Sequence, residues 1–317
     1  MNGIEVSIVL PVYNEENIIE NTVLEVEKIL DSLKLSYEMI LVDDGSEDDT
    51  WKKIDKIEKE RRGGIFKGIL FSRNFGKEAA LLAGLAYSKG DAVITMDSDS
   101  QHPPEKIPEF IKIWKNGYKI VEGIKSSRGD ETTIHHTFAS AFYKLLSRAV
   151  GTDMNNTSDF KLLDREVVNV ILQMPEKQMF YRAISVWVGF RSAKVKFEVQ
   201  KRPHGKSKWT IIKLTKYAIR NITSFTSAPL QIITVLGGLF FLFAMFVGIF
   251  AIIKWANGNA VEGFTTVILL QLIYGSITMF AMGLMGYYIS KLNDEIRGRP
   301  RYIVEKEIGT NEKTGDY

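Results

Sequence analysis

The sequence predicts an α/β protein with a mostly parallel sheet and flanking helices, followed by juxtamembrane amphipathic helices and two transmembrane helices. Across the first 125 residues, short apolar runs typical of buried strands alternate with amphipathic runs typical of helices, which favours parallel strands joined by right-handed crossovers. Residues 221–253 and 263–290 contain no charged side chain, and about 20 apolar residues suffice for a helix to cross a bilayer. A soluble fold with two buried core helices is the alternative for these runs.

The elements of the sheet follow from apolar periodicity in chain order. Strands are expected at residues 6–11, 37–42, 66–71 and 92–96, and a further strand ends in residues 121–125. Helices are expected at residues 17–33, 50–61 and 78–88. Because the carboxyl ends of parallel strands meet at one edge of a sheet, the loops after these strands are expected to line a common ligand-binding edge.

Two carboxylates follow the strand at residues 92–96, just before a segment with two prolines that is expected to open a helix. Strand alternation places Asp97 and Asp99 on the same side of the chain, with Gln101 close behind. Hard oxygen donors at this spacing suit Mg²⁺ or Mn²⁺ shared with a diphosphate. Asp, Ser and Pro are also ordinary turn residues, so a polar turn without a metal is the alternative interpretation.

Further hydrogen-bond acceptors follow the first two strands. Glu15, Asp43 and Asp44 suit a base edge and ribose hydroxyls, although Asp43 to Ser46 also fit an ordinary turn with a helix cap. No Gly-x-Gly-x-x-Gly fingerprint follows the first strand and no P-loop motif occurs, which argues against a dinucleotide cofactor and against P-loop chemistry. Since these carboxylates would repel a bare nucleotide diphosphate, a divalent cation is expected with it.

Four separated motifs, in this order, carry a resemblance to a known family. They are residues 11–15 (Pro-Val-Tyr-Asn-Glu), 43–46 (Asp-Asp-Gly-Ser), 73–77 (Arg-Asn-Phe-Gly-Lys) and 97–105 with its paired aspartates. The chain resembles the family 2 glycosyltransferases of GT-A fold, and within them the polyprenyl-phosphate glycosyltransferases. These include bactoprenol (undecaprenyl-phosphate) glucosyltransferases, aminoarabinose-transferring relatives and, more distantly, dolichyl-phosphate mannose synthases. The resemblance covers roughly residues 4–299.

The resemblance implies a set of site residues. Nucleotide contacts are implied for Pro11, Tyr13, Glu15, Asp43, Asp44, Lys77 and Asp97. Contacts to Mg²⁺ or Mn²⁺ are implied for Asp97, Asp99 and Gln101, and catalytic roles for Asp99 and Asp159. The acceptor phosphate is expected to meet Lys125, Arg128, Arg202, Lys206 and Lys208. Relatives commonly have Arg at the position of Lys125, Gly at Ser158 and Arg at Lys161, so the chain departs from the family pattern there.

Asp159 matches the aspartate that is usually assigned as the base in this family. A phosphate monoester has a second pKa near 6, so a phosphate acceptor is already largely a dianion at neutral pH. Two roles therefore stay open for Asp159: taking the remaining proton from the monoanion, or orienting the nucleophile. A helix or turn cap without a catalytic role is the third interpretation.

The chain is expected to divide into residues 1–200, a cytoplasmic glycosyltransferase domain, 201–226, a basic amphipathic juxtamembrane segment, 227–291, a transmembrane hairpin, and 292–317, a cytoplasmic tail that is flexible from residue 302. Basic residues crowd the outer ends of the hairpin, which predicts that both termini lie in the cytoplasm and that the protein contacts the lipid bilayer. No cleaved signal is evident at the amino end. Cysteine is absent, which excludes disulfides, and the net charge of +3 does not suggest nucleic acid as a partner.

The sequence thus predicts an inverting transferase of the cytoplasmic membrane that moves a hexose, with glucose or N-acetylglucosamine favoured, from a UDP-sugar to undecaprenyl phosphate for modification of a cell-envelope glycan. The alternatives are a transferase that uses GDP-mannose or an aminoarabinose donor, a processive polysaccharide synthase, and a non-catalytic membrane-anchored protein that binds nucleotide-sugars. A processive synthase is expected to carry a Gln-x-x-Arg-Trp element, which does not occur here. The resemblance also implies a homo-oligomer, a tetramer in relatives.

Overall fold

The computed structural model describes residues 3–60, 66–99, 101–126, 157–176, 180–198, 228–257 and 263–309, together with Ser147. The chain divides into two compact units. One comprises Met1–Ala218 with Pro300–Tyr317, and the other comprises Ile219–Arg299. The amphipathic segment expected at 201–226 lies outside the described residues.

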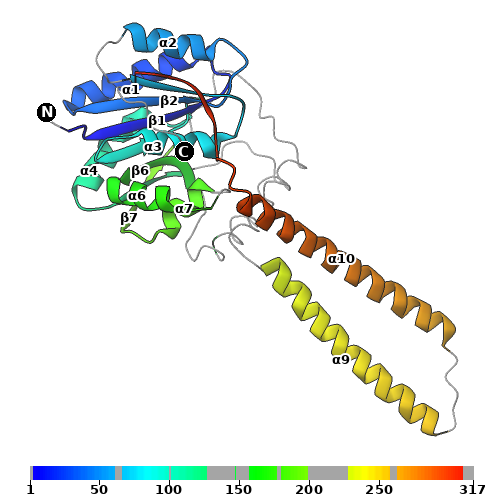
Figure 1. The fold of residues 1–317 in the computed structure, drawn as a ribbon. Helices are drawn as coiled ribbons and strands as arrows, with labels where there is room; N and C mark the ends of the chain where they lie inside the picture. Colours follow the sequence, from blue (N-terminus) through cyan, green and yellow to red (C-terminus); the bar gives the residue numbers. More distant parts are fainter. Residues whose placement is uncertain are drawn as a thin grey trace. The chain divides into compact units, whose positions relative to one another are not determined.

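Among the described residues, eight strands form one sheet in the order β7-β5-β6-β4-β1-β2-β3-β8 (Figure 1). Their bounds are β1 Val6–Val12, β2 Tyr37–Asp43, β3 Phe66–Phe71, β4 Ala92–Thr95, β5 Ile120–Lys125, β6 Thr157–Asp164, β7 Ser192–Phe197 and β8 Val304–Ile308. The central strands β3, β2, β1 and β4 are parallel, as predicted. Antiparallel β6 separates β4 from β5, and antiparallel β8 pairs with β3.

Helices cover both faces of the sheet, which confirms the predicted α/β class. The bounds are α1 Ile19–Leu33, α2 Thr50–Glu60, α3 Lys77–Tyr87, α4 Ile107–Lys115, α6 Arg165–Gln173 and α7 Tyr181–Trp187. Helices α1, α2 and α4 share a hydrophobic core with one face of the strands, whereas α3, α6 and α7 contact one another or the other face. Gly84 of α3 lets this helix lie directly on β1, because a Cβ there would sit 2.1 Å from Val9 Cγ1.

Asp159 lies within strand β6, between β4 and β5. This residue lies in the third position of the strand, so the interpretation of Asp159 as a helix or turn cap is wrong. The cap of the following helix is Asp164, whose carboxylate accepts the backbone N–H of Glu166 at 3.1 Å. The sequence around Asp159 shows no clean strand alternation, because β6 is buried on both faces between β4 and β5.

The segment after the second long helix returns to the sheet, which corrects the expectation of a tail that is flexible from residue 302. Residues 304–308 form β8, and Tyr302 stacks on Phe71 of β3 with ring centroids 4.9 Å apart and an interplanar angle of 11°. The hydroxyl of Tyr87 at the end of α3 also hydrogen-bonds the carboxylate of Glu307. Residues 310–317 lie outside the described part of the chain.

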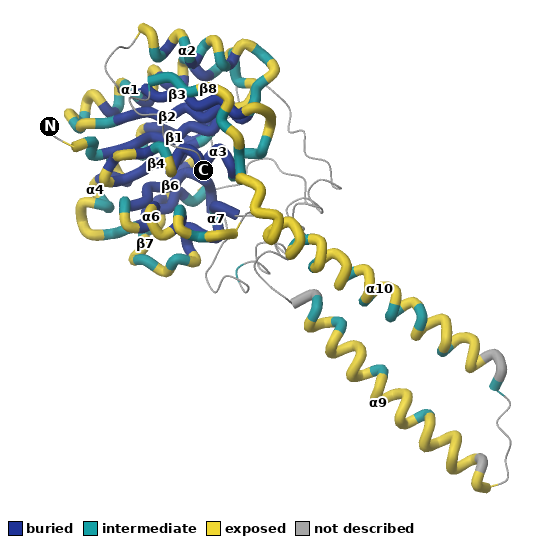
Figure 2. The backbone as a smooth tube through the Cα atoms, viewed as in Figure 1, coloured by how far each residue is buried: buried dark blue, intermediate teal, exposed yellow. Residues whose placement is uncertain are grey.

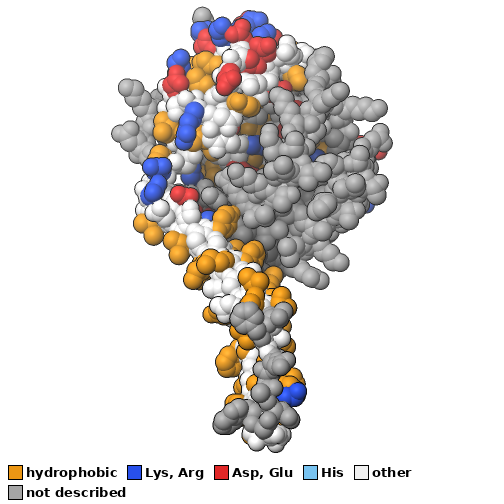
Figure 3. Space-filling view, turned by 90° about the vertical axis from the view of Figure 1, so that its right-hand side faces the viewer, with side chains coloured by type: hydrophobic (Ala, Val, Ile, Leu, Met, Phe, Trp, Pro, Cys, Tyr) orange, Lys and Arg blue, Asp and Glu red, His pale blue; other side chains and the backbone are white. Residues whose placement is uncertain are grey.

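The second unit contains two long helices, α9 (Ala228–Ala256) and α10 (Phe264–Ile296). Within them, Leu230–Lys254 and Thr266–Ile296 are long and apolar enough to cross a membrane, and neither span is buried inside the protein. Their residues are exposed along almost the whole length, and hydrophobic side chains gather on the visible face of this unit (Figures 2 and 3). The two helices touch each other where Phe240 meets Tyr274, with ring centroids 6.1 Å apart. Exposure of this kind contradicts the alternative of buried core helices.

A fully buried ion pair ties three elements of the first unit together. Lys161 of β6 and Glu122 of β5 are 0% and 1% exposed, and their charged atoms lie 3.1 Å apart. The ammonium of Lys161 also donates to the hydroxyl of Ser185 at 2.7 Å and to the carbonyl of Arg182 at 3.2 Å, both in α7. Lys161 therefore has an internal partner for each donor and does not reach a ligand.

Breaking this pair is expected to destabilise the first unit strongly. In Lys161→Met the Glu122 carboxylate stays buried without its cation, which costs roughly 3–5 kcal/mol in unfolding free energy. Thermal unfolding of the full chain in detergent measures the loss, and Lys196→Met, at an exposed position of β7, serves as the matched control. The double variant Lys161→Met/Glu122→Gln should recover part of the loss. Equal melting temperatures for Lys161→Met and Lys196→Met would contradict the role of the pair.

Candidate active site

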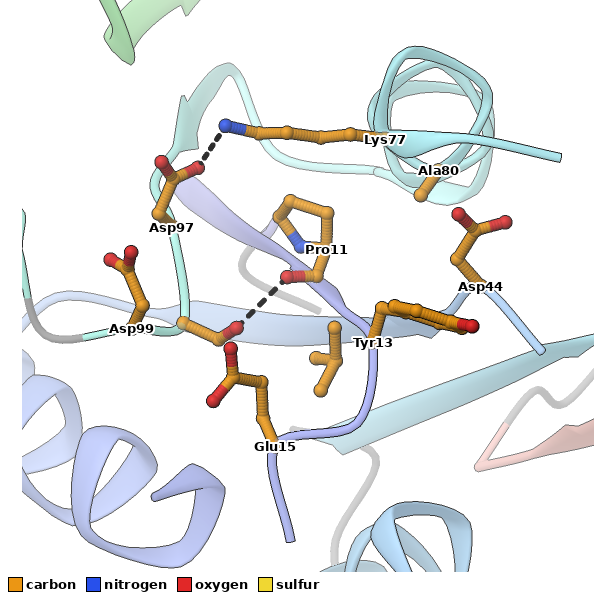
Figure 4. A pocket seen from close by; sticks show the side chains of 10 residues that line it. Pro11, Tyr13, Glu15, Asp44, Lys77, Ala80, Asp97 and Asp99 are labelled. Atoms are coloured by element: carbon orange, nitrogen blue, oxygen red, sulfur yellow. Dashed lines mark hydrogen bonds and ion pairs between the residues drawn. The ribbon is translucent and has the colours of Figure 1, made fainter. Parts of the chain in front are cut away.

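A cavity of about 190 Å³ opens at the carboxyl ends of the central parallel strands (Figure 4). Its walls come from the end of β1, from the loops after β1, β2 and β4, and from the first turn of α3. The lining residues are Pro11, Val12, Tyr13, Glu15, Asp44, Lys77, Ala80, Asp97, Ser98 and Asp99. Seven of the residues singled out from the sequence are therefore brought together here, as the parallel order of the strands requires.

The end of β1 and the loop after it are held by hydrogen bonds to the loops after β4 and β2. The Ser98 hydroxyl donates to the carbonyl of Pro11 at 3.1 Å. The backbone N–H of Asn14, a residue with a positive φ of 55°, donates to the hydroxyl of Ser46 at 2.9 Å. Tyr13 between these anchors is 41% exposed, so its ring is available to a ligand at the cavity mouth.

The loop after β2 combines a turn with a buried acceptor. Asp43 accepts the N–H of Ser46 at 2.8 Å, as in the turn considered from the sequence, and burial raises the pKa of its carboxyl. Asp43 does not line the cavity, and its Oδ2 has no hydrogen-bond partner among the described residues. Gly45 has a φ of +68°, and a Cβ there would lie 2.5 Å from the backbone of Arg73, so this turn packs tightly against the loop before α3.

Asp44 fixes the loop that precedes α3. Its carboxylate accepts the backbone N–H groups of Phe75 at 2.7 Å and Gly76 at 2.9 Å, immediately before α3 begins at Lys77. Burial raises the pKa of the Asp44 carboxyl to about 6, although these two hydrogen bonds work in the opposite direction. Asp44 thus connects the loop after β2 to the helix that carries Lys77.

Asp97 and Asp99 reach the cavity from the end of β4. The Asp97 Oδ1 atom lies 2.5 Å from Nζ of Lys77, which extends across the cavity from α3 (Figure 4). Asp99 accepts the backbone N–H of Gln101 at 3.1 Å, and Gln101 itself is not among the residues that line the cavity. The turn interpretation of this stretch is therefore correct for the backbone, and the carboxylates still face the cavity.

The two carboxylates fit a divalent cation that is shared with a ligand. Among the described residues, no group of three or more His, Asp or Glu side chains is arranged to hold a metal, so the protein offers Asp97 and Asp99 as hard oxygen donors. Mg²⁺ commonly binds in this way, with one or two carboxylates and with phosphate oxygens and water as the remaining ligands. In the structure, the ammonium of Lys77 neutralises Asp97, so a cation bound at Asp97 competes with Lys77.

Asp159 of β6 contacts Lys77 and does not itself line the cavity. Its Oδ2 is 2.5 Å from Nζ of Lys77, and both of its oxygens meet Arg182 of α7, at 2.7 Å from Nε and 2.9 Å from Nη2. The Asp159 side chain is 4% exposed. Although burial disfavours the charged form, Arg182 and Lys77 hold the pKa of Asp159 well below its usual range.

Three side chains at this site were not singled out from the sequence. His102 accepts the backbone N–H of Asp97 at Nδ1, 2.9 Å away, and burial lowers its pKa, so a neutral imidazole fixes the start of the aspartate loop. Glu78 accepts the backbone N–H of Tyr181 at 2.8 Å, and burial, then the charge of Asp159, raises its pKa to about 7. Arg182 is the sole charged residue of α7, and a lone charge in a short apolar helix is the signal that marks it.

The residues expected to bind the acceptor phosphate are described only in part. Lys125 lies at the end of β5 and is half-buried, and burial followed by the positive charge of Arg182 lowers its pKa. Arg128, Arg202, Lys206 and Lys208 lie outside the described residues. Their assignment stays a prediction, as do the nucleotide, metal and catalytic roles of the others.

Comparison with known proteins agrees with these motifs. Residues 7–172 match the family described as glycosyl transferase family 2. An uncharacterized glycosyltransferase of Synechocystis sp. is 39% identical to this chain over 304 residues, covering 95% of each protein. A prophage-derived bactoprenol glucosyl transferase of Shigella flexneri is 34% identical over 304 residues, covering 95% of this chain and 98% of that protein. The chain therefore belongs to glycosyl transferase family 2, as its motifs predict.

Among solved structures, the chain is similar to glucosyl-3-phosphoglycerate synthase from Mycobacterium tuberculosis in complex with Mn²⁺, uridine-diphosphate-glucose and phosphoglyceric acid. The identity is 22%, the TM-score is 0.47, and the match covers 69% of this chain and 77% of that one.

The raised pKa of Asp44 predicts a pH-dependent stability. Its value in the folded chain, about 6, lies above the ordinary 3.8, so between these values the folded state binds more protons than the unfolded state. The free energy of unfolding contributed by Asp44 therefore falls as the pH rises through this window. Relative to Asp44→Asn, which does not titrate, the wild type should lose melting temperature between about pH 4 and pH 6 and little above that range. A constant or opposite difference between the two proteins would contradict the assignment.

Proposed function

We propose that this protein is an inverting glycosyltransferase that moves a hexose from a UDP-sugar to undecaprenyl phosphate at the membrane. The main support is that Asp97, Asp99 and Lys77 converge on one cavity at the strand ends. The same chain also has two helices long enough to span a bilayer. Similarity to a bactoprenol glucosyl transferase along 95% of the chain supports the lipid acceptor and favours glucose over other hexoses.

The donor is proposed to lie along the loops after β1 and β2. Of the residues proposed for the nucleoside, Pro11, Tyr13, Glu15 and Asp44 line the cavity, whereas Asp43 fixes the turn through Ser46. Of those proposed for Mg²⁺ or Mn²⁺ on the diphosphate, Asp97 and Asp99 line the cavity, and Gln101 does not. A divalent ion bound there neutralises charge that develops on the leaving diphosphate. Lys77, which already spans the cavity, supplies a further positive charge on the same side.

The acceptor phosphate is proposed to approach from the β5 and β6 side, where it meets Lys125, Arg128, Arg202, Lys206 and Lys208. A phosphate oxygen attacks the anomeric carbon from the face opposite the UDP group, the bond from that carbon to UDP breaks, and UDP leaves with the electron pair. Since the acceptor is largely a dianion at neutral pH, this step needs no proton acceptor. The depressed pKa of Asp159 favours the orienting role over the role of a base.

The sheet supports a topology with both termini in the cytoplasm. Strands β1 to β7 precede α9 in the chain, and β8 follows α10 and pairs with β3 of the same sheet. In the proposed topology, the chain therefore crosses the membrane an even number of times between β7 and β8, as a two-helix hairpin does. The basic residues beside the hairpin support a cytoplasmic location for this shared sheet, at the inner membrane. A homo-oligomer, with four copies as the first expectation, remains the proposed assembly.

Removal of the Asp99 carboxylate is expected to abolish transfer without unfolding the protein. Purified full-length chain, undecaprenyl phosphate, Mn²⁺ or Mg²⁺ and a panel of radiolabelled UDP- and GDP-sugars should give a labelled lipid with at least one UDP-hexose. Asp99→Asn should lower this rate on the order of 100-fold or more, because a preorganised charge on the leaving group is lost.

The matched control is Asp91→Asn, at an exposed position that precedes the same strand at its other end. It should keep the wild-type rate, and both variants should keep the wild-type melting temperature. A labelled product formed only with GDP-mannose would show that the donor is GDP-mannose and not a UDP-sugar. Binding of a UDP-sugar in calorimetry without turnover would support a non-catalytic binding protein. Full activity of Asp99→Asn would remove its proposed role at the metal.

A further inference from the structure

The first step concerns the carboxylate of Asp159, which is already fully engaged inside the protein. Arg182 pairs with it in a two-pronged arrangement, 2.7 Å and 2.9 Å from its two oxygens, and Lys77 adds a contact at 2.5 Å. A carboxylate held in this way between two cations fixes their positions. The arrangement therefore points to Arg182 and Lys77 as the groups whose placement matters.

The second step concerns helix α7, which carries Arg182 and is held by polar contacts on several sides. The Tyr181 N–H donates to Glu78 of α3 at 2.8 Å, and the Tyr181 hydroxyl lies 2.9 Å from the hydroxyl of Thr95 in β4. Lys161 of β6 donates to the carbonyl of Arg182 and to Ser185. A helix of seven residues is not stable on its own, so these contacts determine where its one charged side chain lies.

The third step concerns charge. Arg182, Lys77 and Lys125 are near enough to interact electrostatically, and the carboxylates near them among the described residues are Asp97, Asp159 and Glu78. If Asp97 serves a divalent cation, three positive side chains among the described residues face two carboxylates, Asp159 and Glu78. The guanidinium side chain of Arg182 is 23% exposed, so this excess of positive charge is not sealed inside the core. A partly exposed group of side chains with surplus positive charge attracts an anion.

We propose that Arg182, oriented by Asp159 and acting with Lys125, binds the phosphate monoester of the acceptor. This inference rests on the proposed transferase function and adds a residue that the family motifs did not supply. Asp159 is then a positioning residue that presents the guanidinium to the incoming phosphate. Phosphate groups also occur in the donor diphosphate, so the test separates the two sources.

The experiment compares wild type, Arg182→Gln, Arg182→Lys and the control Arg191→Gln, all as full-length chains in detergent. Arg191 is exposed just before β7, at the end of the sheet away from the cavity, and carries the same chemical change. Two quantities are measured for each protein: the KM for undecaprenyl phosphate at saturating UDP-sugar, and the Kd for UDP with Mn²⁺ by calorimetry.

For Arg182→Gln, the acceptor KM should rise at least about tenfold, the change that one lost charge-assisted contact produces, while the Kd for UDP changes less than threefold. Arg182→Lys should show a smaller rise, because a lysine keeps the charge and loses the two-pronged geometry. Arg191→Gln should match the wild type in both quantities. If Arg182→Gln does not fold, Arg182→Lys decides by the same two measurements.

An unchanged acceptor KM in a folded Arg182 variant would overturn the inference. A weaker Kd for UDP with an unchanged acceptor KM would also overturn it and would assign Arg182 to the donor diphosphate. Equal weakening of both, with a lower melting temperature, would show a structural role only. A wild-type chain that forms no lipid product from any donor refutes the proposed function, and this outcome is distinct from a failure of the Arg182 assignment.

Discussion

The rest of the site depends on the two ion pairs made by the ammonium of Lys77. It bridges Asp97 at the end of β4 and Asp159 in β6, with both contacts at 2.5 Å. Two carboxylates so close to each other would repel without a cation between them. Lys77 is also the first residue of α3, and the loop before that helix is held by Asp44. One side chain therefore connects the loops proposed for the donor with the strand proposed for the acceptor.

Antiparallel strand β6 supplies Asp159, the second carboxylate that contacts Lys77. A purely parallel sheet brings β1, β2 and β4 to one edge and collects Tyr13, Asp44 and Asp97 there. Strand β6 lies between β4 and β5 and runs in the opposite direction, so Asp159 near its start lies beside the carboxyl end of β4. The neighbouring Lys161 then anchors α7, which returns Arg182 to Asp159. The proposed donor side thus comes from parallel strands, and the proposed acceptor side comes from a strand that runs in the opposite direction.

Local patterns in the sequence predicted the parallel strands and the paired aspartates, because apolar periodicity and strand-end polarity are properties of neighbouring residues. The position of Asp159 inside a strand was not predictable in the same way, since β6 is buried on both faces and lacks alternation. Strand β8 was missed because its charged residues resemble a solvated tail, and only pairing with β3, more than 230 residues away, orders them. Lys161 departs from the family pattern and is used for an internal ion pair with Glu122, a contact that no spacing reveals.

The central claim is that Lys77 holds the place at Asp97 that a divalent cation takes when the donor binds. Titration of Mn²⁺ into the full-length chain, followed by electron paramagnetic resonance, tests it for wild type and Lys77→Met, with Lys56→Met on the surface of α2 as the control. Without nucleotide, Lys77→Met should bind Mn²⁺ at least several-fold more tightly than the wild type, because a positive charge beside Asp97 is removed. With UDP present, the advantage should shrink or reverse, since Lys77 then serves the diphosphate. Equal Mn²⁺ affinities for wild type and Lys77→Met without nucleotide would contradict the account.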